Sequence, residues 1–204
     1  EVLKHILEKG EEYEDRTGVG TIAVTDGTIT KYDLQDGFPA VTTKKLAWKA
    51  LRGEFLWIMQ GKTSDRELSI LTHGVPDKPT IWTANYENQG KSLGYTDGEL
   101  GAIYGHQLRS FEGVTFKDTK GVSVDQLKYI YNALKSVVDT GVYTRKAHFS
   151  YWNPAQLEDS ALEPCHVSCT FNITKNKKLN CLMLMRSNDA FLGESFNIAF
   201  YALL

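Results

Sequence analysis

Cysteine, long apolar runs and an excess of charge of one sign are all scarce in this sequence of 204 residues. The three Cys are unevenly spaced, which excludes a disulfide framework and favours a reducing compartment such as the cytoplasm. No apolar run reaches about 18 residues, so no segment is expected to span a membrane. Residues 1–5 lack the basic-then-apolar pattern of a signal peptide.

The balance of charges excludes a generally basic protein of the kind that binds nucleic acid over its whole surface. Lys and Arg number 23 against 25 Asp and Glu, and the formal net charge is −2. Any anion must therefore be bound by a local group of cations. The hydrophobic and charged shares, 42% and 24%, are typical of a globular chain. At about 150 residues per domain, the length predicts one domain.

Apolar spacing predicts two helices, and a pair of polar residues predicts the start of a third. A helix within residues 2–10 should end at its glycine, and 46–60 is apolar almost all round, which predicts a buried helix. Ser123 and Gln126 have the spacing of a capping box. They predict a helix that ends at Gly141.

Strands are predicted where apolar residues alternate or form short runs. Residues 166–173 alternate cleanly, and 179–185 predict a second, more fully buried strand. Residues 20–34 predict a hairpin with its turn at 26–27. Residues 85–105 are rich in Gly, Asn and Tyr and predict a loop that carries function.

Cys165 precedes one predicted strand, and Arg186 ends the next, so the two should lie side by side. A nearby Arg favours a thiolate, which suggests a nucleophile, but a small buried residue fits the pattern as well. His166 should point to the opposite face, which excludes a Cys-His dyad. Cys169 shares the face of Cys165 but lies about 13 Å away, too far for one zinc ion.

Glu54 lies inside the predicted apolar helix. A carboxylate there is costly unless it is paired or hydrogen-bonded. It could be a general acid/base with a raised pKa or a structural carboxylate, and the pattern leaves both open. Trp82, Tyr86 and Tyr104 could stack on a ring or belong to the core.

Three short segments offer local cations. Arg16 precedes two glycines in a loop that could hold a phosphate, although it lacks the ending of a P-loop. Arg145 and Lys146 form a second pair, and Lys44 and Lys45 a third. For each of them, an ordinary solvated surface is the alternative.

Short segments, in order along nearly the whole chain, resemble the thymidylate synthase family and its phage branch in particular. One such segment would be weak, but this many in one order form a specific signal. The segments are 16–21 (RTGVGT), 37–45 (GFPAVTTKK), 54–61 (EFLWIMQG), 81–82 (IW), 98–107 (GELGAIYGHQ), 152–154 (WNP), 164–166 (PCH), 186–189 (RSND), 191–193 (FLG) and 196–199 (FNIA).

The resemblance implies an α/β fold with a large mixed β-sheet and flanking helices. It implies a homodimer in which two subunits pack sheet to sheet, and a single catalytic domain over residues 1–204. The apolar helical run 196–204 has no cap and no polar last turn. We therefore also expect a C-terminal part of the domain to be missing from this chain.

The resemblance further implies reductive methylation of dUMP, with 5,10-methylenetetrahydrofolate as co-substrate and without a metal. Cys165 matches the thiolate that attacks C6 of the pyrimidine, and Arg186 is the cation beside it. Glu54 matches the general acid/base. Tyr104 matches the tyrosine that helps to remove the C5 proton.

Other positions match ligands of the two substrates. Arg145 matches an arginine donated to the partner subunit's phosphate site, so activity would need the dimer. Asn197 matches the amide that recognises uracil. The other nucleotide positions are Arg16, Lys146, Arg186, Ser187, Asp189 and His166. The folate positions are Lys44, Ile81, Trp82, Asn85, Leu162, Asp189, Leu192, Gly193 and Phe196.

Several positions depart from the usual family pattern. Lys146 replaces an Arg and loses its bidentate fork, Thr83 replaces the Asp after the Trp, and Met185 replaces a Gln. Residues 185–189 look more like the phage deoxycytidylate hydroxymethylases, but Asn197 stands where those enzymes carry an acidic residue. A dUMP 5-hydroxymethyltransferase is therefore the alternative. The other departures are Ala102, Glu194 and Ser195.

A nucleotide- or RNA-binding relative without turnover is a further alternative. Such a protein would have lost the nucleophile or the acid/base, and both Cys165 and Glu54 are present. The expected location is the cytoplasm, or the host cytoplasm if a phage encodes the protein. Neither a membrane nor nucleic acid is an expected partner.

Overall fold

The computed structural model describes residues 1–14 and 18–204, so Arg16 lies outside the described residues. The chain forms two compact units. The first consists of Glu1–Leu46 and Asn188–Leu204, and the second of Ala47–Ser187.

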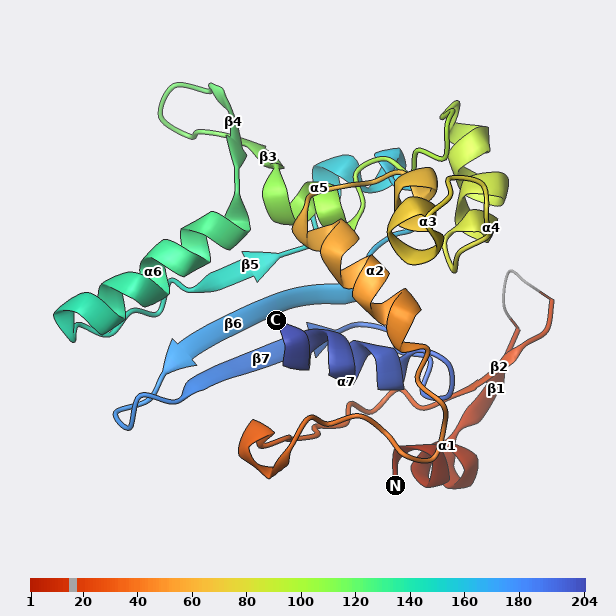
Figure 1. Ribbon diagram of the computed structural model, residues 1–204, viewed down its shortest axis with the longest axis horizontal. Coiled ribbons are helices and arrows are strands. Elements are labelled where there is room, and N and C mark those ends of the chain that lie inside the picture. Colours follow the sequence, from red (N-terminus) through yellow and green to blue (C-terminus); the bar gives the residue numbers. More distant parts are fainter. Residues whose placement is uncertain (15–17) are drawn as a thin grey trace. The chain divides into compact units, whose positions relative to one another are not determined.

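A three-stranded antiparallel sheet is the centre of the second unit. Its order is β5 (His148–Ser150), β6 (His166–Ile173) and β7 (Leu179–Met185), and Figure 1 shows β6 and β7 side by side. Cys169 pairs with Phe149 on one side and with Met183 on the other. The two predicted strands are confirmed at the predicted bounds.

Helices pack against each other and around this sheet. The longer ones are α2 (Trp48–Met59), α3 (Asp65–His73) and α6 (Gln126–Thr140), with the short α4 (Thr83–Asn85) and α5 (Tyr104–Arg109). A hairpin of β3 (Phe111–Val114) and β4 (Gly121–Val124) leads into α6. The single turns of helix are Tyr86–Gly90, Lys91–Leu93 and Pro154–Asp159.

The core of the second unit forms where α2, α3 and α5 meet. Trp57 of α2 is fully buried, and its indole N–H donates to the Ser64 carbonyl over 3.0 Å. Gly53 allows α2 to approach α3 closely, because a Cβ there would collide with the Thr72 side chain. The other largest buried side chains are Leu51, Leu68, Leu100, Ile103, Leu108, Phe149 and Tyr151.

The described part of the first unit contains two α-helices, a short 3-10 helix (Leu34–Asp36) and a small hairpin. Helix α1 (Val2–Lys9) ends at Gly10 as predicted, and α7 (Glu194–Leu203) lies in the predicted apolar run. The predicted hairpin at 20–34 is wrong. Strand β2 (Thr21–Ala23) instead pairs with β1 (Glu11–Tyr13), so the connection precedes β2 rather than following it.

The predicted capping box is also wrong. Ser123 lies in β4, and Asp125 is the N-cap of α6, with its carboxylate accepting from the Lys128 N–H over 3.0 Å. Asp125 also pairs with Arg109 over 2.9 Å. The carboxylate therefore satisfies a free amide at the start of the helix. The predicted end is confirmed, since Gly141 adopts a left-handed φ of 72°.

Three predictions of burial or loop structure fail in part. Helix α2 forms as predicted but is not buried all round, because Trp48 and Leu56 are exposed. The predicted loop 85–105 contains helical turns and the start of α5. Strand β7 is not the more buried of the two, since Leu182 and Leu184 are 67% and 57% exposed.

Candidate functional site

Glu54 and Trp82 form the first contact of the candidate site, in the second unit. Glu54 lies on α2, and Trp82, 4% exposed, immediately precedes α4. The Trp82 indole N–H donates to Glu54 Oε1 over 2.8 Å. Burial raises the pKa of Glu54, and the hydrogen bond from Trp82 opposes this rise. An upward shift of this kind is the one expected of a carboxyl that acts as a general acid/base.

Tyr104 connects Trp82 to the cysteine. It is the first residue of α5 and is 6% exposed, and its ring meets that of Trp82 edge to face at 5.9 Å. Its hydroxyl oxygen accepts from the Cys165 backbone N–H over 2.8 Å. Burial, followed by the nearby Cys165, raises the pKa of Tyr104. The hydroxyl therefore stays protonated and can still donate a hydrogen bond.

Cys165 and Arg186 lie side by side, as the sequence predicted. The Arg186 backbone N–H donates to the Cys165 carbonyl over 3.0 Å. The Arg186 guanidinium donates to the Pro164 carbonyl over 2.9 Å and lies 5.0 Å from the centre of the Trp152 ring. These contacts hold the arginine in place at the end of the strand that carries the cysteine.

These residues form a continuous series of contacts, called here the Glu54–Cys165 series: Glu54, Trp82, Tyr104 and Cys165. His166 joins it, because its ring lies 5.1 Å from that of Tyr104. Four residues chosen from separate sequence segments are thus brought together within one unit. A thiol, a buried carboxyl and a protonated phenol along one path are suited to nucleophilic attack with proton transfer.

The other predicted residues of the second unit lie at its surface or beside the series. Ile81 is 67% exposed, Asn85 ends α4, and Leu162 is half-buried before Cys165. Arg145 and Lys146 are exposed between α6 and β5. Ser187 is also exposed, directly after Arg186.

A second group of predicted residues meets in the first unit, at the start of α7. Asp189 Oδ1 accepts from the Leu192 N–H over 2.7 Å, and its backbone carbonyl accepts from the Gly193 N–H over 2.9 Å. A Cβ at Gly193 would lie 3.2 Å from that carbonyl, which favours glycine. Asn197 donates to Asn188 over 3.1 Å. Asp189 therefore has a structural part whatever else it binds.

Lys44 belongs to the same group. Its ammonium donates to the carbonyls of Phe191 and Leu192 over 2.8 and 3.2 Å, and it lies 5.7 Å from the centre of the Phe196 ring. The alternative of a freely solvated lysine is therefore wrong. Lys44 instead binds the loop that carries the predicted folate residues.

Two structural residues of the site were missed by the sequence interpretation. Trp152, within the WNP segment, supports Arg186, and Asp65 is buried near Trp82. The proximity of WNP to the cysteine segment in the family pattern could have indicated the first. Nothing in the local pattern distinguished Asp65 from an ordinary acidic residue in the first turn of a helix.

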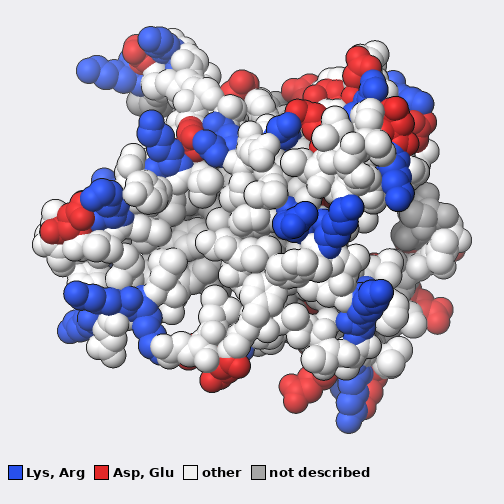
Figure 2. Space-filling view, in the orientation of Figure 1, with Lys and Arg blue, Asp and Glu red and all other residues white. Residues whose placement is uncertain are grey.

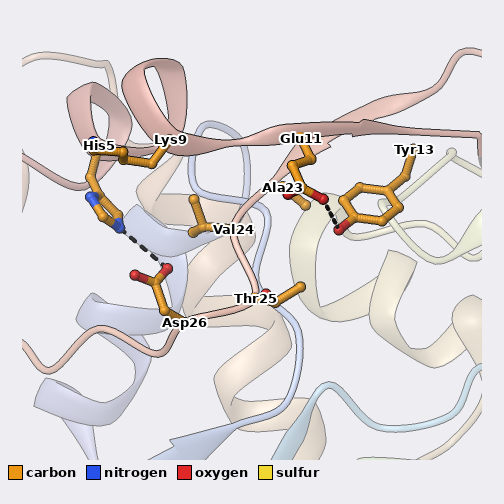
Figure 3. Close-up of a pocket in the computed structure, with 8 residues that line it drawn as sticks. All are labelled: His5, Lys9, Glu11, Tyr13, Ala23, Val24, Thr25 and Asp26. Atoms are coloured by element: carbon orange, nitrogen blue, oxygen red, sulfur yellow. Dashed lines mark hydrogen bonds and ion pairs between the residues drawn. The ribbon is translucent and has the colours of Figure 1, made fainter.

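The surface elsewhere carries side chains of both charges (Figure 2) and a hollow in the first unit. Figure 2 shows basic and acidic side chains interspersed on one face of the molecule. A shallow hollow in the first unit, drawn in Figure 3, has His5 3.3 Å from Asp26 and the Tyr13 hydroxyl 3.0 Å from Glu11. Among residues 1–14 and 18–204, no three His, Cys, Asp or Glu side chains are placed to hold a metal ion. No helix in this described part is long and apolar enough to cross a membrane.

Comparison with known proteins identifies the family. The family model described as thymidylate synthase matches residues 1–204. The thymidylate synthase of Enterobacteria phage T4 is 45% identical over 205 residues, which cover all of this chain and 66% of the relative. The human thymidylate synthase is 40% identical over 210 residues, covering 99% of this chain and 63% of the human protein.

A solved structure agrees in fold as well as in sequence. The crystal structure of thymidylate synthase from phage T4 has a TM-score of 0.84 and 44% identity, and the match covers 99% of this chain and 65% of that one. The expected α/β fold is confirmed. This chain spans about two thirds of the length of the relatives it matches. On the full-length family match and these identities, the chain belongs to the thymidylate synthase family.

Proposed function

We propose that the protein is a thymidylate synthase, which transfers a one-carbon unit from 5,10-methylenetetrahydrofolate to C5 of dUMP and reduces it. The products are dTMP and dihydrofolate. The observation that carries the proposal is the Glu54–Cys165 series, in which contacts through Trp82 and Tyr104 connect a buried acid/base to the residue that carries the thiol. The relatives are named as synthases, which does not favour the hydroxymethyltransferase alternative.

Cys165 begins the reaction as the nucleophile. Its thiolate forms a bond to C6 of the pyrimidine, and the C5–C6 electron pair moves to give an enolate with a nucleophilic C5. C5 then bonds to the methylene carbon of the folate, and one of the two bonds from that carbon to a folate nitrogen breaks. Arg186, whose backbone N–H donates to the Cys165 carbonyl, contributes positive charge at the same strand end.

Glu54 and Tyr104 handle the protons. Glu54, whose pKa burial raises above its ordinary value, gives and takes the proton, and Trp82 fixes the direction of its carboxyl. Tyr104, whose hydroxyl stays protonated, assists removal of the C5 proton by holding the acceptor through a hydrogen bond. Loss of the C5 proton breaks the remaining bond from the methylene carbon to the folate nitrogen. The folate then transfers a hydride to that carbon and becomes dihydrofolate, while the bond between the Cys165 sulfur and C6 breaks and releases dTMP.

The substrates are held by the remaining predicted residues. The dUMP phosphate is bound by Arg16, Arg186, Ser187 and by Arg145 of the partner subunit, with Lys146 beside it. Asn197 recognises the uracil, and His166 and Asp189 support the nucleotide. The folate contacts are Lys44, Ile81, Trp82, Asn85, Leu162, Asp189, Leu192, Gly193 and Phe196.

The same proposal includes a homodimer in the cytoplasm, or in the host cytoplasm if a phage encodes the protein. The exposed Leu182 and Leu184 of β7 support sheet-to-sheet packing, because apolar strand faces are normally covered. We also propose that the two units act as parts of one catalytic domain, since one family model spans both.

The test combines the full-length protein that contains this chain with dUMP and 5,10-methylenetetrahydrofolate, and identifies the nucleotide by mass spectrometry. A methyl product together with dihydrofolate is expected. A hydroxymethyl product with tetrahydrofolate would overturn the proposal in favour of the hydroxymethyltransferase. An unchanged nucleotide that still binds would favour the binding protein without turnover.

A pair of variants tests the nucleophile. Cys165→Ala should abolish turnover while dUMP still binds in equilibrium dialysis. Cys181→Ala is the matched control, because it removes an exposed thiol from the same sheet. Turnover by Cys165→Ala at the rate of the control would exclude the mechanism.

A further inference from the structure

Asp65 is a buried carboxylate that has no role in the sequence analysis or in the proposed mechanism. It is the first residue of α3 and is 7% exposed. Its two oxygens accept hydrogen bonds from two threonine hydroxyls, Thr80 Oγ1 at Oδ1 and, over 2.7 Å, Thr83 Oγ1 at Oδ2. These partners lie 15 and 18 residues further along the chain, so Asp65 connects α3 to the first residue of α4 and to the segment before it.

The same two hydroxyls also accept hydrogen bonds from backbone amides, one of Trp82 itself and one two residues before it. Thr80 Oγ1 accepts from the Trp82 N–H over 3.0 Å, and Thr83 Oγ1 accepts from the Thr80 N–H over 2.9 Å. A hydroxyl has one proton, and here each gives it to Asp65 and accepts from an amide. The carboxylate, which only accepts, thus sets the direction of every bond in this network.

The charges nearby do not explain the burial of Asp65. Its neighbour Arg66 pairs with Asp77 and Asp97 over 3.4 and 3.2 Å, and no described ion pair includes Asp65. An acidic residue at the start of a helix is favoured by the helix dipole, but this alone would leave the side chain at the surface. The hydroxyls of Thr80 and Thr83 offset the cost of burial instead.

We propose that Asp65 is a positioning residue that, through Thr80 and Thr83, orients Trp82 so that its indole N–H reaches Glu54. The orientation of Trp82 does not depend on the proposed function, whereas the effect on turnover rests on it. The inference also accounts for a departure in the sequence. Thr83 stands where an Asp usually follows the Trp, and here the carboxylate comes from α3 instead.

The direct test follows the indole N–H of Trp82 by nitrogen-15 NMR in the full-length protein. The signal is assigned by its loss in Trp82→Phe. Asp65→Asn keeps the shape but replaces an acceptor by an NH2 group, so one hydroxyl loses its partner. The Trp82 signal should shift. Asp77→Asn is the matched control, since Asp77 is exposed and close to Arg66, and it should leave the signal in place.

A second pair of variants keeps the test valid if Asp65→Asn does not fold. Thr83→Val removes the hydroxyl at nearly constant volume, and Thr83→Ser keeps it. The indole signal should shift in the first and stay in the second. Equal signals in Thr83→Val and Thr83→Ser, or no shift in a folded Asp65→Asn, would overturn the proposal.

Turnover separates this inference from the proposed function. Asp65→Asn and Thr83→Val should lower kcat about tenfold, because a misplaced group costs rate, while the KM for dUMP changes less than about twofold. Thr83→Ser, which keeps the hydroxyl, should have the kcat of the unmodified protein. If the unmodified protein makes no dTMP, the proposed function fails, yet the NMR result still decides the positioning role. If dTMP forms and the indole signal does not respond, only the positioning role fails.

Discussion

The Glu54–Cys165 series and the exposed Arg145–Lys146 pair differ in how far the protein itself satisfies their polar groups. Trp82 and Tyr104 are 4% and 6% exposed, and each has a hydrogen bond within the second unit. Arg145 and Lys146 are exposed. Buried polar groups are costly to leave unpaired, whereas exposed cations are solvated until an anion arrives. Changes in the series should therefore alter stability and catalysis together, and changes in the pair should alter binding alone.

After the loss of turnover expected at Cys165, the largest effect in the series is expected at Glu54. Glu54→Gln should lower kcat about 10²- to 10⁴-fold, since the amide cannot exchange a proton. Glu8→Gln on α1, exposed and paired only with Lys4, is the control and should keep full activity. A kcat within threefold of the control would show that Glu54 is a structural carboxylate.

The same variant has an opposite effect on stability. Because burial raises the folded-state pKa of Glu54 above its unfolded value, folding takes up a proton. The stability that Glu54 contributes is therefore largest at low pH and is lost as pH rises through the folded-state pKa. Above that pH, Glu54→Gln should unfold at higher urea concentration than the unmodified protein, and the difference should disappear in acid. A constant difference at all pH values would contradict the raised pKa.

A smaller effect is expected at Tyr104. Tyr104→Phe leaves the Cys165 N–H without its acceptor and should cost about 1–3 kcal/mol of unfolding free energy. The measurement is urea unfolding followed by circular dichroism. Tyr131→Phe, on an exposed side chain of α6, is the control and should change stability by less than about 0.5 kcal/mol. Equal stability of the two variants would show that the hydroxyl adds nothing to the series.

The contrast also explains which parts of the fold could be predicted from the sequence. Strand β6 alternates and has its inward face buried, so the local pattern was sufficient. Strand β7 is as apolar, but its burial depends on what covers it, and no local pattern contains that information. The sequence predicts Ser123 as the N-cap of α6, because Ser123 and Asp125 are both residues that cap helices and the local pattern does not separate them. Asp125 is the N-cap in the structure, where its carboxylate is also stabilised by Arg109, 16 residues earlier in the chain.

The candidate site divides in the same way. Cys165 and Arg186 were predicted as neighbours because adjacent strands place them together. The sequence marks Glu54 as an unusual carboxylate in an apolar helix and leaves both a catalytic and a structural part open. The partner that bears on this choice, the Trp82 indole N–H, lies 28 residues away and is placed beside Glu54 only by the fold. The positioning role of Asp65 depends on two hydroxyls 15 and 18 residues away in the chain. No helical or strand periodicity in the sequence relates residues at that separation.

On the exposed side, Arg145→Ala should separate binding from stability. The KM for dUMP should rise about 10- to 100-fold, as expected for a lost charge-assisted hydrogen bond to phosphate. The unfolding free energy should change by less than about 0.5 kcal/mol, because the side chain is exposed. A loss of more than about 1 kcal/mol, measured by urea unfolding, would show that Arg145 is satisfied within the protein and would remove the contrast.

The smallest effect is expected at Lys146, where a conservative change sharpens the same contrast. Lys146→Arg keeps the charge and adds a planar fork that can bind phosphate through two hydrogen bonds. Because the residue is exposed, the added atoms meet solvent rather than packed side chains, so stability should not change. The KM for dUMP should fall by about two- to threefold in low salt, and because the charge is unchanged, the ratio of the two KM values should persist in 0.5 M salt, where screening weakens phosphate binding by both proteins alike. An unchanged KM at both salt concentrations would mean that Lys146 lies outside the phosphate site. Of the exposed pair, Arg145 alone would then bind the phosphate.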